Sequence, residues 1–191
     1  CRIPVINALT DLSHPCQAMA DFLTLREHKG ALSNVKLAYV GDGNNVCHSL
    51  MLAAARGGTA MAVATPPGYE PNPEVVRAAR EDGRATGFSL ALTNSAEEAV
   101  SGADAVYTDV WASMGQEAEK EKRARIFAPY QVNARLMAHA KKDALFLHCL
   151  PAHRGEEVTD EVIDSANSVV YDEAENRLHA QKAILIALMG A

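Results

Sequence analysis

A thiol, two imidazoles and a guanidinium follow one short apolar segment of the chain. Residues 144–147 read Ala-Leu-Phe-Leu, and residues 148–155 read His-Cys-Leu-Pro-Ala-His-Arg-Gly. The apolar segment predicts a buried strand, and ligands of open α/β sheets bind beyond the carboxyl ends of the strands. The Cys149 thiol is therefore placed where it can meet a substrate. A single cysteine there also packs as a small apolar residue, so its neighbours must decide its role.

Two other predicted strand ends carry polar groups that suit an amino acid. The strand at 35–40 leads into Gly-Asp-Gly-Asn-Asn (41–45), and the strand at 105–108 leads into Asp-Val-Trp-Ala-Ser-Met-Gly (109–115). In a parallel sheet, both ends lie on the same edge as Cys149. Together they offer amides, a carboxylate, a hydroxyl and a thiol, which can bind the ammonium and carboxylate groups of an amino acid.

The glycine-rich turn at 41–45 is also compatible with a dinucleotide site, which would make the chain part of an NAD-dependent oxidoreductase. That fingerprint needs a third glycine, and Val46 occupies the position where it would fall. A glycine-aspartate-glycine sequence alone is typical of a tight turn. We therefore treat the dinucleotide site as a disfavoured alternative.

The pattern of apolar residues predicts strands that alternate with helices along most of the chain. The expected strands are 35–40, 59–64, 88–92, 105–108, 144–147 and 168–171, with helices at 45–56, 73–82, 96–100, 131–140 and 160–165. Such alternation implies right-handed crossovers. We expect a doubly wound, Rossmann-like parallel sheet of five to six strands with helices on both faces.

Two strongly apolar helices are predicted outside this alternation, at 14–28 and 174–189. They either pack on the sheet or also cover something that the chain lacks. His14 and Gln17 supply donors at the start of the first helix, where an anion is favoured. Arg177 lies in the first turn of the second helix, where the macrodipole disfavours a cation. It therefore either pairs with Glu173 or serves a bound anion.

Composition excludes several classes of protein. The chain has 191 residues, of which 48% are hydrophobic and 22% are charged, which predicts one globular domain rather than disorder. The net charge of −6 without a basic stripe argues against nucleic acid as a partner. No apolar run is long enough for a membrane span, and nothing at the start resembles a signal peptide. The four scattered cysteines lack C-x-x-C spacing and fit a reducing, intracellular compartment.

In this order, the motifs resemble the transcarbamylase family. The resemblance runs from His-Pro-Cys-Gln (14–17) to Glu-Asn-Arg (175–177), and the three strand-end segments lie between them. The Ser-Met-Gly and His-Cys-Leu-Pro segments favour the ornithine carbamoyltransferase branch over the aspartate branch. The resemblance implies a trimeric transferase of arginine biosynthesis that makes citrulline and phosphate from ornithine and carbamoyl phosphate. It also implies no metal or organic cofactor, and a cytoplasmic location, or the mitochondrial matrix in a eukaryote.

The resemblance also assigns roles to residues. For ornithine, it implies that the α-carboxylate is bound by Asn45 and by the backbone at Met114, and the α-ammonium by Asp109 and Ser113. For carbamoyl phosphate, the implied contacts are the side chains of His14, Gln17 and Arg177 and the backbone carbonyls of Cys149 and Leu150. A cis Leu150-Pro151 bond is implied as well.

The chemistry of the transfer requires a proton acceptor. The δ-amine of ornithine must be neutral to attack the carbamoyl carbon, but a free alkyl ammonium has a pKa near about 10. Cys149 beside Asp109 is the candidate for relaying this proton, and as a thiolate it could stabilise the developing positive charge. A covalent acyl-cysteine route is the disfavoured alternative.

One expected motif is missing from the sequence. The family's phosphate cradle, Ser-Thr-Arg-Thr, belongs to an N-terminal carbamoyl-phosphate domain and does not occur in these 191 residues. We therefore expect residues 1–191 to form the ornithine-binding domain with its two interdomain helices, at 14–28 and 174–189, without activity alone. The alternatives are a noncatalytic amino-acid-binding fragment and a transcarbamylase that acts on a related amine.

Overall fold

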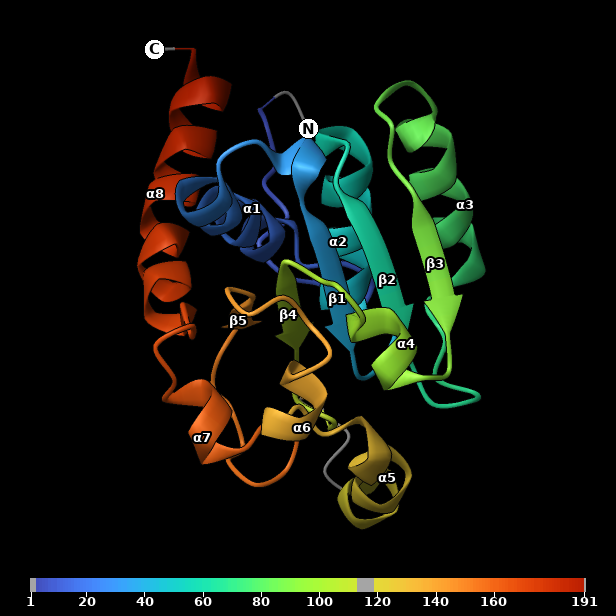
Figure 1. The fold of residues 1–191 in the computed structure, drawn as a ribbon. Helices are drawn as coiled ribbons and strands as arrows, with labels where there is room; N and C mark the ends of the chain where they lie inside the picture. The colour runs from blue at the N-terminus through green and yellow to red at the C-terminus, as the bar shows by residue number, and fades with distance from the viewer. Residues whose placement is uncertain (1–2, 113–118, 191) are drawn as a thin grey trace.

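The computed structural model describes residues 3–112 and 119–190, which form a three-layer α/β fold around one parallel sheet (Figure 1). The strand order in the sheet is β3-β2-β1-β4-β5, and every neighbouring pair is parallel. The strands are β1 (Lys36–Val40), β2 (Ala60–Ala64), β3 (Leu90–Thr93), β4 (Ala105–Thr108) and β5 (Leu145–His148). The predicted doubly wound parallel sheet is confirmed.

Helices cover both faces of the sheet because alternate strand residues are buried on opposite sides. One face packs against α1 (Pro15–Lys29), α2 (Asn45–Gly57) and α3 (Pro73–Asp82). The other face packs against three short helices, which are α4 (Ala96–Val100), α6 (Ala134–Met137) and α7 (Asp160–Ile163). The long C-terminal helix α8 (Val170–Met189) packs on α1 beside β5 (Figure 1).

The sixth predicted strand, at 168–171, is wrong. Ser168 forms one isolated bridge to Phe146, and α8 already begins at Val170, four residues before the predicted start of this helix. The β-branched pair Val169-Val170 favours a strand locally, but the helix that follows extends backwards over it. The helices predicted at 131–140 and 160–165 are present in shorter form, as α6 and α7.

The helix α5 (Lys120–Phe127) was not predicted from the sequence. Its apolar residues are few, so the periodicity that marks an amphipathic helix is weak. Phe127 is fully buried, and Arg123 is buried as well. Their burial shows that α5 is anchored by one aromatic ring and one buried guanidinium.

The chain reverses its direction of travel through the sheet at β1. From β1 it continues to β2 and β3 on one side, and then returns to β4 and β5 on the other. The crevice between β1 and β4 is therefore the topological switch point, where open α/β sheets bind ligands. Thr108 pairs with His148 in the register of β4 and β5, so the next residues, Asp109 and Cys149, lie side by side beyond the sheet.

Within the described residues, no helix combines the length and the apolar character that a membrane span requires.

Gly43 provides a test of the packing that shapes the turn after β1. A Cβ atom at Gly43 would lie 2.3 Å from the backbone nitrogen of Pro71 and 2.7 Å from the carbonyl oxygen of Tyr69. Gly43→Ala should therefore lower the free energy of unfolding by about 2 kcal/mol, as overpacking typically does. Gly57→Ala is the matched control, because its Cβ would meet ordinary contacts at 3.6 Å. Equal urea midpoints for the two variants would contradict this account.

Candidate functional site

Asp109 lies at the switch point and accepts three hydrogen bonds from the described part of the chain. The backbone N–H of Val110 and the Cys149 thiol donate to Oδ1, at 2.8 Å and 3.0 Å. The side-chain amide of Asn44 donates to Oδ2 at 2.7 Å. The carboxyl group is only 5% exposed, so these contacts fix its orientation. A carboxylate offers about four lone-pair sites, so the hydrogen bonds from the described residues leave one site on Oδ2 for a ligand.

The side-chain amide of Asn44 is oriented toward Asp109 because the same amide caps helix α2. Its Oδ1 accepts from the backbone N–H groups of Val46 and Cys47 at the start of α2. The Tyr39 hydroxyl contacts the same oxygen at 3.2 Å. With Oδ1 used in this way, the N–H groups of the amide must face Asp109. Asn44 was not singled out from the sequence, although its position before a predicted helix is typical of an N-cap.

The surroundings of the Cys149 thiol favour its neutral form. Burial raises its pKa well above the ordinary value, and the charge of Asp109 and the hydrogen bond to Asp109 raise it further. The thiol therefore donates a hydrogen bond rather than acting as a resting thiolate. The thiolate form considered from the sequence is disfavoured by this environment.

His148 fixes the turn that follows β5. Its side chain is fully buried, and its Nδ1 accepts a hydrogen bond from the Leu150 N–H at 2.9 Å. Its Nε2 lies 3.2 Å from Oε1 of Glu157. Leu150 has a φ of 54°, and the Leu150-Pro151 bond is cis, as the family resemblance implied.

His14 and Gln17 at the start of α1 meet Arg177 of α8. Because α8 begins at Val170, Arg177 lies about two turns inside the helix, and its predicted place in the first turn is wrong. Arg177 Nη1 donates to Gln17 Oε1, and the charge of Arg177 also acts on His14. Two of their nitrogen atoms, His14 Nδ1 and Arg177 Nε, are buried without a hydrogen-bond partner. Burial lowers the pKa of His14, and the charge of Arg177 lowers it further, so the imidazole is neutral. Buried nitrogens without a partner among the described residues, on two neighbouring side chains, are consistent with a polar ligand.

The ion pair between Arg177 and Glu173, one of the two alternatives for Arg177, is not observed. Within the ranges 3–112 and 119–190, Arg177 lies in no ion pair, and Glu173 accepts from Gln17, Tyr107 and the His148 backbone instead. The other alternative, that Arg177 serves a bound anion, remains a prediction.

The predicted ornithine-binding residues are only partly described. Asn45 is the first residue of α2, and its amide donates to the Thr10 carbonyl at 2.8 Å, so it lies on the same edge as Asp109 but is already engaged. Ser113 and Met114 lie outside the described residues. The segment before them is anchored by Arg123, whose guanidinium donates to the Trp111 carbonyl and pairs with Asp42.

Three potential metal ligands lie close together at this edge. Ligand atoms of Asp109, His148 and Cys149 all lie within 4.8 Å of one another. Both His148 ring nitrogens and the thiol already make hydrogen bonds within the protein. These contacts explain the arrangement without an ion, and we assign no metal site.

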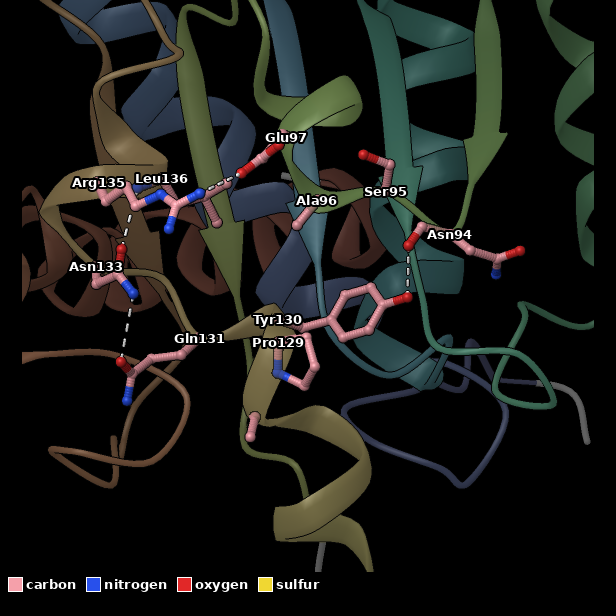
Figure 2. Close-up of a pocket in the computed structure, with 11 residues that line it drawn as sticks. Asn94, Ser95, Ala96, Glu97, Pro129, Tyr130, Gln131, Asn133, Arg135 and Leu136 are labelled. Atoms are coloured by element: carbon pink, nitrogen blue, oxygen red, sulfur yellow. Dashed lines mark hydrogen bonds and ion pairs between the residues drawn. The ribbon is translucent and has the colours of Figure 1, made fainter.

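A separate cavity lies on the other face of the sheet, between α4 and the segment that leads into α6 (Figure 2). Its volume is about 390 Å³, and Tyr130 crosses it to donate a hydrogen bond to the Asn94 carbonyl. Arg135 and Glu97 form an ion pair across its rim. None of the residues predicted for the site lines this cavity. We therefore favour the strand-end crevice as the functional site.

Comparison with known proteins agrees with this geometry. Residues 33–188 match the model of the family "Aspartate/ornithine carbamoyltransferase, Asp/Orn binding domain". Residues 1–27 match the model of the carbamoyl-P binding domain of the same family. The chain belongs to the aspartate/ornithine carbamoyltransferase family.

Individual carbamoyltransferases are similar over nearly the whole chain. An ornithine carbamoyltransferase of Carboxydothermus hydrogenoformans is 64% identical over 188 residues, which are 98% of this chain and 60% of that protein. The structure of ornithine carbamoyltransferase from Pyrococcus furiosus matches with a TM-score of 0.96 at 59% identity, over 100% of this chain and 61% of that one. An acetylornithine transcarbamylase complexed with acetylcitrulline matches with a TM-score of 0.86 at 35% identity, over 98% and 59%. The chain thus spans about 60% of the length of these carbamoyltransferases.

The state of the Cys149 thiol can be tested by alkylation with iodoacetamide. Because the thiolate reacts and the pKa of Cys149 is raised, this cysteine should react more slowly at pH 8 than a cysteine in the unfolded chain. Asp109→Asn removes one of the charges that raise the pKa of Cys149 and should increase the rate about tenfold. Cys47 is fully buried and reports unfolding, so it should stay unmodified in both proteins. Faster reaction in the parent than in the variant would contradict this account.

Proposed function

We propose that this chain supplies the ornithine-binding half of an ornithine carbamoyltransferase, which forms citrulline and phosphate from ornithine and carbamoyl phosphate. The observation that carries the proposal is the pairing of Asp109 with Cys149 at the switch point of the sheet. His14, Gln17 and Arg177 gather beside this pair, since both Asp109 and Arg177 act electrostatically on His14. The high identity to named ornithine carbamoyltransferases supports the same conclusion.

In this proposal, Asp109 binds the α-ammonium group of ornithine. Oδ2 has one lone-pair site left beside the Asn44 hydrogen bond, and a charged N–H donor would fill it at short range. Ser113 adds a second acceptor, and Asn45 and the Met114 backbone bind the α-carboxylate. Binding to Asn45 requires its amide to leave the Thr10 carbonyl.

The thiol relays the proton that the δ-amine must lose. Cys149 already donates its proton to Asp109 Oδ1 at 3.0 Å, so the sulfur can accept a proton from the amine as it passes its own proton to the carboxylate. The thiol carries no net charge before or after this transfer. No acyl-cysteine intermediate is needed.

The second substrate lies between α1 and α8. The neutral His14 imidazole and Gln17 contact the carbamoyl group, and the carbonyls of Cys149 and Leu150 accept from its NH₂. Arg177 adds a cation near the leaving phosphate. The buried orphan nitrogens of His14 and Arg177 support this placement, because carbamoyl and phosphate oxygens would satisfy them.

The remaining phosphate contacts belong to the carbamoyl-phosphate-binding domain. Large apolar side chains are exposed along α8 and along the segment before α1, where burial against another domain would be favourable. These exposed residues are Ile3, Val5, Ile6, Leu9, Leu12, Tyr171, Leu178, Leu185, Ile186, Leu188 and Met189. Because residues 1–27 already match the carbamoyl-P binding domain, we propose that the rest of that domain covers these side chains, and that the complete enzyme is a trimer.

A related amine is the second candidate substrate, since an acetylornithine transcarbamylase shares the fold. Acetylation of the α-amine removes its positive charge. Asp109 would then face a neutral amide, and its buried charge would lose the partner that ornithine supplies. The geometry therefore favours ornithine.

Complementation tests the proposed function directly. The chain is combined with the carbamoyl-phosphate-binding domain of a close relative and supplied with carbamoyl phosphate and ornithine. We expect citrulline from the combination and little or none from the chain alone. Replacing ornithine with acetylornithine should lower kcat/KM at least about 100-fold, because the charge pairing is lost. An equal or higher value for acetylornithine would identify the related amine as the substrate, and no turnover would favour a noncatalytic fragment.

Variants of the proton relay give a second test in the same assembly. Cys149→Ser replaces the thiol by a hydroxyl that gives up its proton less readily, so kcat should fall about 100-fold, within the range for a lost acid–base group. The KM for carbamoyl phosphate should change little. Cys16→Ser, at a buried cysteine that Asp109 does not contact, is the control. Equal kcat for the parent and Cys149→Ser would remove the thiol from the mechanism.

A further inference from the structure

Two carboxyl groups are buried against each other between α1 and α8. Asp21 and Glu173 are both fully buried, and one amide nitrogen contacts both of their carboxyl groups. Gln17 Nε2 donates to Asp21 Oδ1 at 2.7 Å and to Glu173 Oε1 at 3.1 Å. The Tyr107 hydroxyl donates to the same Glu173 oxygen at 3.1 Å, and the His148 N–H donates to the other oxygen at 3.0 Å. The pair therefore joins both helices to the ends of β4 and β5.

Both carboxyl groups cannot be ionised together at this position. Two adjacent carboxylates repel each other, and burial disfavours the charge of each. Burial raises the pKa of Asp21 to about 7, and burial and the charge of Asp21 raise the pKa of Glu173 well above its ordinary value. Asp21 Oδ2 is buried without any other partner, which fits an acceptor for a proton carried by Glu173.

The charges of the groups around the carboxyl pair are matched by a single negative charge on the pair. Burial and both carboxyl groups raise the pKa of the Tyr107 hydroxyl, so it is neutral. The Cys149 thiol and the His14 imidazole are neutral for the reasons given above. Arg177 is the cation whose charge acts on Asp21. A singly protonated pair is thus balanced by one guanidinium.

The pair also fixes the orientation of the Gln17 amide. Its nitrogen donates to both carboxyl groups, so its oxygen must face Arg177, whose Nη1 donates to it. A flipped amide would place N–H groups against the guanidinium, which has no acceptor. The side chains of Gln17 and Arg177 are therefore set by Asp21 and Glu173.

We propose that Asp21 and Glu173 share one proton and act as positioning residues that hold Gln17 and Arg177 in the orientation that carbamoyl phosphate requires. The proposal rests on the proposed function, since the roles of Gln17 and Arg177 toward that substrate come from it. Asp21 and Glu173 do not touch the reacting atoms. They act through the amide and the guanidinium that they orient.

The shared proton can be measured in the chain without any substrate. A protonated carboxylic acid has an infrared C=O band distinct from that of a carboxylate, and we expect this band at pH 8 in the parent. It should disappear in Glu173→Gln and persist in Glu175→Gln, which changes an exposed residue of the same helix. The same band in all three proteins, or its absence from the parent, would overturn the shared proton.

The pH dependence of the protein's stability tests the shared proton independently. Because the folded-state pKa of Asp21 is raised, folding binds a proton, and the stability that Asp21 contributes is lost as the pH rises from about 4 to about 7. Asp21→Asn removes this loss. The Tm of the variant minus the Tm of the parent should therefore increase by about 5 °C between these two pH values. A constant Tm difference would contradict the proposal.

The positioning role is read from affinity for carbamoyl phosphate, measured by calorimetry in the complemented assembly without ornithine. Glu173→Gln places an amide NH₂ group, which cannot accept a hydrogen bond, opposite the donors of Tyr107 or His148. The Kd for carbamoyl phosphate should therefore rise about tenfold. Asp21→Asn keeps the acceptor for Gln17, so its Kd should stay within about twofold. Unchanged Kd in Glu173→Gln would overturn the role. Because this readout needs no turnover, it stays separate from the citrulline assay that tests the proposed function.

Discussion

The hydrogen bonds that hold Asp109 are the constraint on which the rest of the site depends. A carboxylate that is 5% exposed needs donors, and it receives them from three separate parts of the fold. Asn44 comes from the end of β1, Val110 from the end of β4 and Cys149 from the end of β5. These contacts require the three strand ends to converge, which the order β2-β1-β4-β5 provides. Among the described residues, the same contacts leave one acceptor position on Oδ2, and they favour the neutral form of the thiol.

The two halves of the site are electrostatically connected. Cys149 responds to Asp109 and also to the carboxyl pair of Asp21 and Glu173 between α1 and α8. The His148 backbone N–H donates to Glu173, so the strand end that carries the thiol is connected to the helices that carry the residues proposed to bind carbamoyl phosphate. In the proposed enzyme, the two substrates would meet where these networks touch. A buried polar network of this kind is stable only if its donors and acceptors are matched, which explains why a proton must remain on the carboxyl pair.

The sequence predicted the fold well, because strand and helix alternate with strong apolar patterns. The five strands, α3 and α4 lie where they were expected. The strand at 168–171 was predicted wrongly because its β-branched residues favour a strand locally, and the local sequence does not reveal that a long helix includes them. The carboxyl pair was missed for a related reason. Gln17 and Asp21 are four residues apart on one helix, a spacing that the sequence reveals, but their contact with Glu173 spans more than 150 residues. Only the tertiary structure brings that partner to them.

The most direct test of the central claim is a crystal structure of the complemented assembly with citrulline and phosphate bound. The account predicts that the α-ammonium group of citrulline lies within hydrogen-bonding distance of Asp109 Oδ2, with the ureido group between Cys149 and Gln17. An amino acid bound instead in the cavity beside Tyr130, with Asp109 still bonded only to its protein partners, would contradict the account.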